Sequence, residues 1–292
     1  MPLVVVFGGN FLFFFWCQKV KDNSWIDALW GLTFFFPNIA LLIYRYVSSS
    51  SSSSKPDPDA RCFIVLTLVG IWGFRLCYHI AKRHRDEDFR YKEMRADWME
   101  KGGGYTGYLW RAFLYVFMLQ ALFSVISNAA ALYVLIYSSS DYLIWLDFVG
   151  VAVWLFGFTF EVIGDRQLTN HIADKTPGKK KFINSGLWKY TRHPNYFGEA
   201  VLWWGVYLIA CSVEWGWVTF FAPLFISLLI RFVSGVPLLE KKYKGNPEWE
   251  AYCAQVNVFF PWFPTTKPDE AANPEDLAEP LLAPSQRQEQ NP

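Results

Sequence analysis

The sequence has little charge and lacks the patterns that mark a metal site or a disulfide framework. Of its 292 residues only 18% are charged, and the formal net charge is +1. The five cysteines form no C-x-x-C pair and mostly fall within apolar runs, so we interpret them as small core residues. There is no H-E-x-x-H motif and no N-x-S/T sequon. We therefore predict no metal site. Because the basic residues cluster beside apolar runs, we also predict no nucleic-acid partner.

Apolar and aromatic residues take the place of the missing charge. Hydrophobic residues make up 53% of the chain and aromatic residues 20%. This composition, with its long apolar runs, predicts an all-α polytopic membrane protein embedded in a lipid bilayer. The first 17 residues are apolar but lack a basic n-region and a small-residue cleavage site. We interpret them as a first membrane helix rather than a signal peptide.

We predict about seven membrane segments within a single domain over residues 1–264, the last two forming a short hairpin. Pro37 predicts a kink in the second segment. The run Tyr108–Tyr137 is long enough for one helix that tilts or extends beyond the bilayer. The predicted segments are Leu3–Cys17, Ala28–Val47, Arg61–Ala81, Tyr108–Tyr137, Tyr142–Ile163, Glu199–Cys211 and Trp217–Val233.

The distribution of charge predicts the orientation of the chain. Most Lys and Arg residues fall in loops 82–107 and 164–195 and in Glu240–Lys244, which seven segments place on one side. We predict that this side is cytosolic and includes the C-terminus. The mixed charges of loop 82–107 predict a folded, paired segment. The serine run Ser48–Ser54 predicts a flexible loop on the opposite side, and the polar, Pro-rich residues 265–292 predict a disordered cytosolic tail.

One dinucleotide-binding pattern occurs and is rejected. Gly102, Gly104 and Gly107 match G-x-G-x-x-G. No strand is predicted before them and a membrane helix follows, so the Rossmann context is missing.

The most informative stretch is Gly186–Glu199, which reads G-L-W-K-Y-T-R-H-P-N-Y-F-G-E and leads into an apolar run. Lys189 and Arg192 suit an anion such as phosphate, although alone they are as readily topology anchors. Pro194 fits the first turn of the following helix, whose free N–H groups favour negative charge. Glu199 falls about one turn inside the membrane, where an ionisable group indicates function.

Further polar residues predict a cavity on the same side of the membrane. Arg75 and His79 share one helical face, and so do Glu161 and Asp165. Asp27 lies at the mouth of the second segment, where it is either part of a substrate pocket or an acid favoured by the helix dipole. Such a cavity suits a charged nucleotide whose reactive ring reaches a lipid-like substrate. From the residues alone, the candidates are Arg75, His79, Arg90, Tyr91, Asp165, Gln167, Lys189, Arg192, His193, Asn195 and Glu199.

R-H-P-N-Y-x-G-E after G-L-W resembles the C-terminal signature of the membrane steroid 5α-reductase-like superfamily, and within it the DUF1295 branch. The resemblance extends over about Asp27 to Pro264. It implies an NADPH-dependent reductase of an activated carbon–carbon double bond in a steroid, sterol or other lipid. Further matching pieces are Asp27–Gly31, Trp72–Arg75, Glu87–Tyr91, Asp165–Leu168 and Ser234–Glu240.

The resemblance also implies contacts with NADPH. Asn195 and Glu199 are expected near the nicotinamide end of the cofactor. The residues that share the matching motifs are Asp165, Trp188, Arg192, His193, Asn195, Tyr196, Glu199 and Glu240.

Catalysis in the steroid 5α-reductases implies two further residues. An acid from an early helix and a tyrosine polarise the substrate carbonyl there. In this chain the nearest candidates are Asp27 and Tyr78, with Glu199 as the third predicted catalytic residue.

Two other functions compete with the reductase. Membrane isoprenylcysteine and phospholipid methyltransferases also carry an R-H-P-x-Y turn before a helical hairpin and would use S-adenosylmethionine. Asn195 after the proline and Glu199 after Gly198 favour the reductase. A non-enzymatic sterol-binding or structural protein would leave Glu199 and the charged loops unexplained.

Localisation follows from the same resemblance. It implies the endoplasmic reticulum, where lipid substrates are found. Asp276–Leu282 also resembles an acidic di-leucine sorting signal, which would indicate another endomembrane.

Overall fold

The computed structural model describes residues 1–50, 57–140 and 142–265. Every regular element in these residues is helical, as predicted. Six helical stretches among them are long and apolar enough to cross a membrane. The predicted tail, with its di-leucine signal, lies outside the described residues except for residue 265.

The first three helices confirm the first three predicted spans and extend beyond them. They are α1 Pro2–Val20, α2 Trp25–Ser50 and α3 Ala60–Arg83. Helix α2 continues through Pro37, and it also includes the first three serines of the predicted loop. The hydroxyls of Ser49 and Ser50 both donate to the carbonyl of Tyr46, which supports this last turn.

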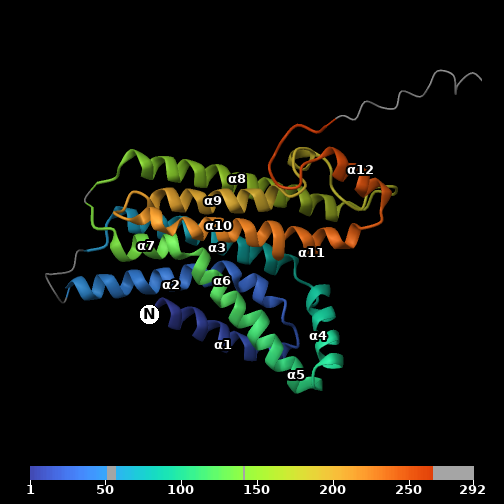
Figure 1. Cartoon of the computed structure of the whole chain (residues 1–292), viewed down its shortest axis with the longest axis horizontal. Coiled ribbons are helices and arrows are strands. Elements are labelled where there is room, and N and C mark those ends of the chain that lie inside the picture. The colour runs from blue at the N-terminus through green and yellow to red at the C-terminus, as the bar shows by residue number, and fades with distance from the viewer. Residues whose placement is uncertain (51–56, 141, 266–292) are drawn as a thin grey trace, which may run out of the picture.

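The predicted single helix over Tyr108–Tyr137 is wrong, because the chain bends at Asn128. Before the bend come α5 Gly104–Arg111, the π-helix η1 Ala112–Met118 and α6 Leu119–Ser127, and after it comes α7 Ala129–Tyr137. The Asn128 amide donates to Asn38 Oδ1 at 2.9 Å and to the Phe34 carbonyl at 3.3 Å. These buried contacts fix the bend against α2, so α6 and α7 point in different directions (Figure 1).

The second half of the chain forms a hairpin against one long helix. Helix α8 spans Trp145–Ala173, so the polar residues after Ile163 remain helical instead of forming a loop. The hairpin consists of α9 Pro194–Ala210, the 3-10 turn η3 Gly216–Phe220 and α10 Phe221–Leu228, followed by the π-helix η4 Leu229–Val233. The remaining elements are η2 Gly186–Lys189, α11 Val236–Glu240, η5 Lys241–Tyr243 and α12 Pro247–Gln255.

The predicted pairing of loop 82–107 is confirmed. Its helix α4 spans Phe89–Lys101. Arg95 pairs with Glu87 at 2.5 Å, and His84 pairs with Asp22 of the loop between α1 and α2 at 2.7 Å. Figure 1 shows α4, α11 and α12 at one end of the bundle and the turn between α7 and α8 at the other. The basic loops therefore share one end, and its cytosolic orientation stays a prediction.

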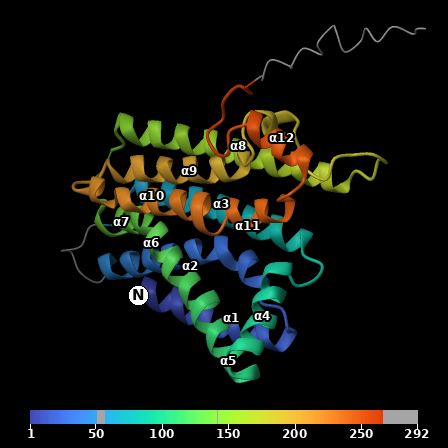
Figure 2. The ribbon, with the colours of Figure 1, turned by 45° about the vertical axis from the view of Figure 1, so that its right-hand side comes forward.

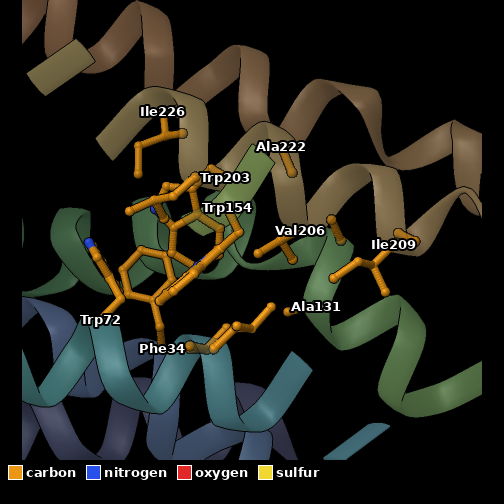
Figure 3. Packing of buried hydrophobic residues seen from close by; sticks show 14 of the residues in the cluster. Phe34, Trp72, Ala131, Trp154, Trp203, Val206, Ile209, Ala222 and Ile226 are labelled. Carbon is orange, nitrogen blue, oxygen red and sulfur yellow. The ribbon is translucent and has the colours of Figure 1, made fainter. Parts of the chain in front are cut away.

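An aromatic core joins four helices in the middle of the bundle (Figure 3). Phe34, Trp72, Trp154 and Trp203 come from α2, α3, α8 and α9, and each is at most 1% exposed. The Trp72 and Trp203 rings meet edge to face at 5.1 Å, and Phe34 lies 4.8 Å from Trp203. Because lipid is as apolar as a core, specific ring packing of this kind holds membrane helices together.

Glycines bring the backbones of α8 and α9 into direct contact. Gly150, Gly157 and Gly164 recur every seven residues on α8, and Gly198 and Gly205 do so on α9. A Cβ atom at Gly157 would lie 2.5 Å from the Leu202 nitrogen, and one at Gly198 would lie 2.5 Å from the Glu161 nitrogen. The two helices lie side by side in both ribbon views (Figures 1 and 2). This contact brings the polar residues of α8 and α9 together.

Candidate active site

A polar cluster lies one to three turns beyond the aromatic core, where α3, α8 and α9 meet. Arg75 of α3 contacts two carboxylates of α8, with Nη1 2.5 Å from Glu161 Oε1 and Nη2 2.5 Å from Asp165 Oδ2. The Asn195 amide of α9 donates to Asp165 Oδ1 at 3.0 Å, and His79 Nε2 lies 3.7 Å from Asp165 Oδ2. The predicted face of Arg75 and His79 therefore meets the predicted face of Glu161 and Asp165.

This cluster contains more acid than base. Glu199 is 8% exposed and interacts electrostatically with Asp165, Arg75 and Glu161. Three carboxyl groups thus share a single guanidinium. Two buried acceptors, Glu161 Oε2 and Asn195 Oδ1, have no hydrogen-bond partner in the described part of the chain. Buried polar atoms are normally paired. Trp72 supplies an N–H donor to the Glu161 carboxyl group, so Asn195 Oδ1 is the acceptor that indicates a place for a ligand with an N–H donor.

A second cluster forms where loop 82–107 packs against α2. Asp27 Oδ2 lies 2.8 Å from Arg90 Nη2, and the Tyr91 hydroxyl donates to Asp27 Oδ1 at 2.6 Å. Gln120 Nε2 of α6 donates to the Tyr91 oxygen at 3.4 Å. Burial, reinforced by the charge of Asp27, raises the pKa of Tyr91 well above its usual value. Tyr91 therefore keeps its proton at neutral pH and acts as a hydrogen-bond donor.

Tyr196, on the first turn of α9, lies within electrostatic range of both clusters. The hydroxyl of Tyr196 interacts electrostatically with Glu199 and Asp165 of the first cluster and with Arg90 and Asp27 of the second. The acid–tyrosine pair and the α8–α9 carboxyl groups therefore lie close enough to act on one buried hydroxyl group.

The turn before α9 is fixed to α8 by Gln167 and Trp188. Gly186 has φ of 64°, a left-handed conformation that favours glycine, and it packs against the end of the Gln167 side chain. Gln167 Oε1 accepts the Leu187 N–H at 3.0 Å, and Trp188 Nε1 donates to the Gly164 carbonyl at 3.2 Å. Both predicted cofactor residues thus position the R-H-P-N turn.

Glu240 connects the same turn to α11. Its Oε1 atom lies 3.0 Å from Arg192 Nε and 2.9 Å from His193 Nε2. The Arg192 backbone N–H also donates to the Asn257 carbonyl at 2.9 Å. The His193 ring stacks on Tyr196 with centroids 5.6 Å apart, so this network is continuous with the site.

Acid is expected to destabilise the protein through His193. Burial lowers the pKa of His193 below the usual histidine value, so the folded state keeps the ring neutral. Below about pH 6.5 the unfolded chain takes up the proton first, and the free energy of unfolding falls as pH falls. Thermal unfolding in detergent between pH 7 and 5 should show this slope, and His193→Asn should reduce it. An equal slope in the variant would contradict the assignment.

Two predicted residues lie apart from the site. Tyr78 is 65% exposed on α3, with Lys82 Nζ 5.5 Å from its ring centre. Lys189 is exposed on η2. The structure also adds Gln120, and it brings Glu161, which the sequence places on the face of Asp165, into direct contact with Arg75. Glu161 carries a signal in the sequence, as an acid inside an apolar run one turn before Asp165, whereas nothing local marks Gln120.

A basic cavity of about 480 Å³ lies beside the network around Glu240. Most of its lining residues come shortly after α11 in the sequence. The cavity is lined by Lys181, Lys242, Tyr243, Lys244, Gly245 and Asn246. Such a lining suits a phosphate. Among the described residues no group of three or more His, Cys, Asp or Glu could hold a metal ion.

Comparison with known proteins places these features in a family. Residues 13–256 match a family described as "Protein of unknown function (DUF1295)". An uncharacterized protein of Schizosaccharomyces pombe is 26% identical over 82% of this chain and 73% of its own length. Methanethiol S-methyltransferase 1 of Bradyrhizobium diazoefficiens is 28% identical over 42% of this chain and 43% of the enzyme. Bovine (Bos taurus) 3-oxo-5-alpha-steroid 4-dehydrogenase 1 is 31% identical over 47% and 53%.

The chain therefore spans about half the length of each of these two enzymes. No solved structure matches it.

Proposed function

This chain belongs to the DUF1295 family within the steroid 5α-reductase-like superfamily, and we propose that it transfers a hydride from NADPH to the activated carbon–carbon double bond of a steroid, sterol or other lipid. The observation that carries this proposal is the hydrogen-bonded pair of Asp27 and Tyr91, 2.6 Å apart. A reductase of enones needs such a proton donor, whereas methyl transfer to a thiol does not. The match to the bovine enzyme supports the same class.

The donors and acceptors of the site fit NADPH at two places. The carboxamide of a nicotinamide offers N–H donors, and Asn195 Oδ1 is a buried acceptor without a partner among the described residues. The phosphates need cations, and the cavity around Lys181, Lys242 and Lys244 supplies them. NADPH would thus bind with its ring between α8 and α9 and its phosphates near α11. When bound, it supplies the hydride.

The proton comes from the second cluster. Tyr91 turns its O–H from Asp27 to the substrate carbonyl and donates the proton as the double bond accepts the hydride at its β-carbon. Gln120 donates to the tyrosine oxygen and Arg90 lies 5.6 Å from its ring, so both stabilise the negative charge left on Tyr91. The enol that forms then becomes the saturated ketone when its α-carbon takes up a proton from solvent and its O–H proton returns to Tyr91.

A second candidate function is methyl transfer from S-adenosylmethionine. The excess of carboxyl groups around Arg75 suits the cationic sulfonium and ammonium groups of that cofactor. The match to methanethiol S-methyltransferase 1 points the same way. The basic cavity has no role in this alternative, because S-adenosylmethionine carries no phosphate.

Cofactor binding separates the two functions. We expect NADPH to raise the melting temperature of the purified protein in detergent, with S-adenosylmethionine causing no shift, because a ligand that binds the native state stabilises it by mass action. At 100 times its Kd such a ligand contributes about 2.7 kcal/mol. A shift in melting temperature with S-adenosylmethionine alone would instead support methyl transfer as the function of this chain.

Substitution of the lysines of the basic cavity tests where the phosphates of NADPH bind. The double variant Lys242→Ala, Lys244→Ala is expected to weaken NADPH about tenfold or more and to weaken NADH by no more than that, since both carry a pyrophosphate and NADPH carries one further phosphate. Lys101→Ala, at a lysine 71% exposed on α4, serves as the control. Unchanged binding of NADPH in the double variant would contradict a phosphate site there.

A further inference from the structure

A groove of about 330 Å³ runs between α1 and α2, within the membrane-spanning length of both helices. Its lining is apolar apart from Asn10 and Thr33. The Thr33 hydroxyl is already satisfied, because it donates to the Trp30 carbonyl at 2.6 Å. Asn10 is therefore the polar residue of the groove with hydrogen-bonding capacity to spare.

The Asn10 side chain leaves one acceptor unpaired. Its Nδ2 donates to the Val6 carbonyl at 2.9 Å, which fixes the orientation of the amide. Its Oδ1 is buried and has no partner in the described residues, and the whole residue is only 1% exposed. Water is absent from the bilayer core, so an unpaired acceptor is costly there. A ligand with an O–H or N–H donor would satisfy it.

Gly9 gives the groove its depth. A Cβ at Gly9 would meet no atom within 4 Å, so this glycine serves no close contact between helices. Glycine inside a helix costs roughly 0.5–1 kcal/mol relative to alanine. Its one visible effect is the missing side chain beside Asn10, which leaves space in the groove.

We propose that this groove binds a lipid alcohol, whose apolar body lies along α1 and α2 and whose hydroxyl donates to Asn10 Oδ1. A pure hydrocarbon lacks the donor, and the lining offers no charge to a phosphate headgroup. The site is distinct from the polar clusters but borders them. Phe13 and Leu29 line the groove and also pack in the hydrophobic cluster that contains Tyr91. This inference does not depend on the proposed reduction.

Binding of matched alcohols and ethers tests the proposal. The probes are cholesterol and 1-hexadecanol, each compared with its own methyl ether on the purified full chain in detergent. For at least one pair we expect the alcohol to bind about fivefold or more tightly than the ether, the contribution of one net hydrogen bond. Asn10→Leu is expected to abolish this preference.

A pair of neighbouring glycines supplies the control for shape. Gly9→Leu should fill the groove and weaken binding of the preferred alcohol at least tenfold. Gly8→Leu should leave it unchanged, because Gly8 also faces open space but does not line the groove. Equal binding of alcohol and ether for both pairs would overturn the proposal, as would unchanged binding in Gly9→Leu. If Asn10→Leu fails to fold, Gly9→Leu and Gly8→Leu still test whether the alcohol binds in the groove. A groove covered by a second copy of the chain, seen by cross-linking, would also overturn it.

Discussion

Replacing Tyr91 with phenylalanine is expected to lower kcat for reduction of a lipid enone at least about 100-fold, since general acid catalysis typically contributes 10²–10⁴-fold. The change removes one oxygen, the atom that donates to Asp27 at 2.6 Å and accepts from Gln120 at 3.4 Å. NADPH binding should persist, because the groups attributed to the cofactor are Asn195 of α9 and the lysines of the basic cavity. The measurement is single-turnover oxidation of NADPH, with NADPH affinity determined separately by thermal shift.

Tyr78→Phe is the matched control for this prediction. The sequence suggests Tyr78 as the tyrosine partner of Asp27, but its side chain is 65% exposed on α3. We therefore expect the Tyr78 variant to keep its kcat. A loss of turnover in Tyr78→Phe with full activity in Tyr91→Phe would make Tyr78 the proton donor and require α3 to turn inward.

The sequence predicts the composition of the site better than its geometry. Ionisable residues stand out in apolar runs, so Arg75, Asp165 and Glu199 are found from the membrane environment alone. Which of them meet cannot be predicted, since helical periodicity places residues on a face and does not identify the opposing helix. Asp27 illustrates this. Its tyrosine partner lies in a charged loop 64 residues later in the chain.

For the membrane spans too, the sequence predicts that the helices exist but not where they bend or end. Hydropathy detects each apolar run but does not register the bend at Asn128, which arises from a hydrogen bond to Asn38, 90 residues away. A buried amide pair between helices leaves no local signal. Helix α8 shows the opposite case, because it is longer than its apolar run. Its last turns are polar, yet they remain helical because Asp165 and Gln167 are paired with α3 and with the turn before α9.

The glycines of α8 and α9 carry a signal for packing that hydropathy does not register. Gly150, Gly157 and Gly164 repeat at the same interval of seven as Gly198 and Gly205. Small residues at a fixed helical spacing predict close packing of membrane helices. The shared interval is therefore the feature of the sequence that indicates the pairing of α8 with α9.

Gly198→Ala is accordingly expected to damage both stability and activity. Its Cβ would lie 2.5 Å from the Glu161 nitrogen and 2.5 Å from the Gly157 carbonyl oxygen. Both are backbone atoms inside a long helix and cannot move aside alone. Overpacking of this kind costs typically about 1–3 kcal/mol. We expect the upper end of that range, measured as a fall in melting temperature in detergent.

Gly8→Ala adds the same methyl group to a membrane helix where no atom lies within 4 Å, and it should leave stability unchanged or slightly raised. Activity should fall further than stability in Gly198→Ala. Glu199 is the next residue and the added methyl would press on the backbone of Glu161, so separation of the helices moves both carboxyl groups. A displacement of about 1 Å at a catalytic site can cost 10²-fold in rate. A folded variant with normal turnover would show that α8 and α9 do not set the geometry of the site.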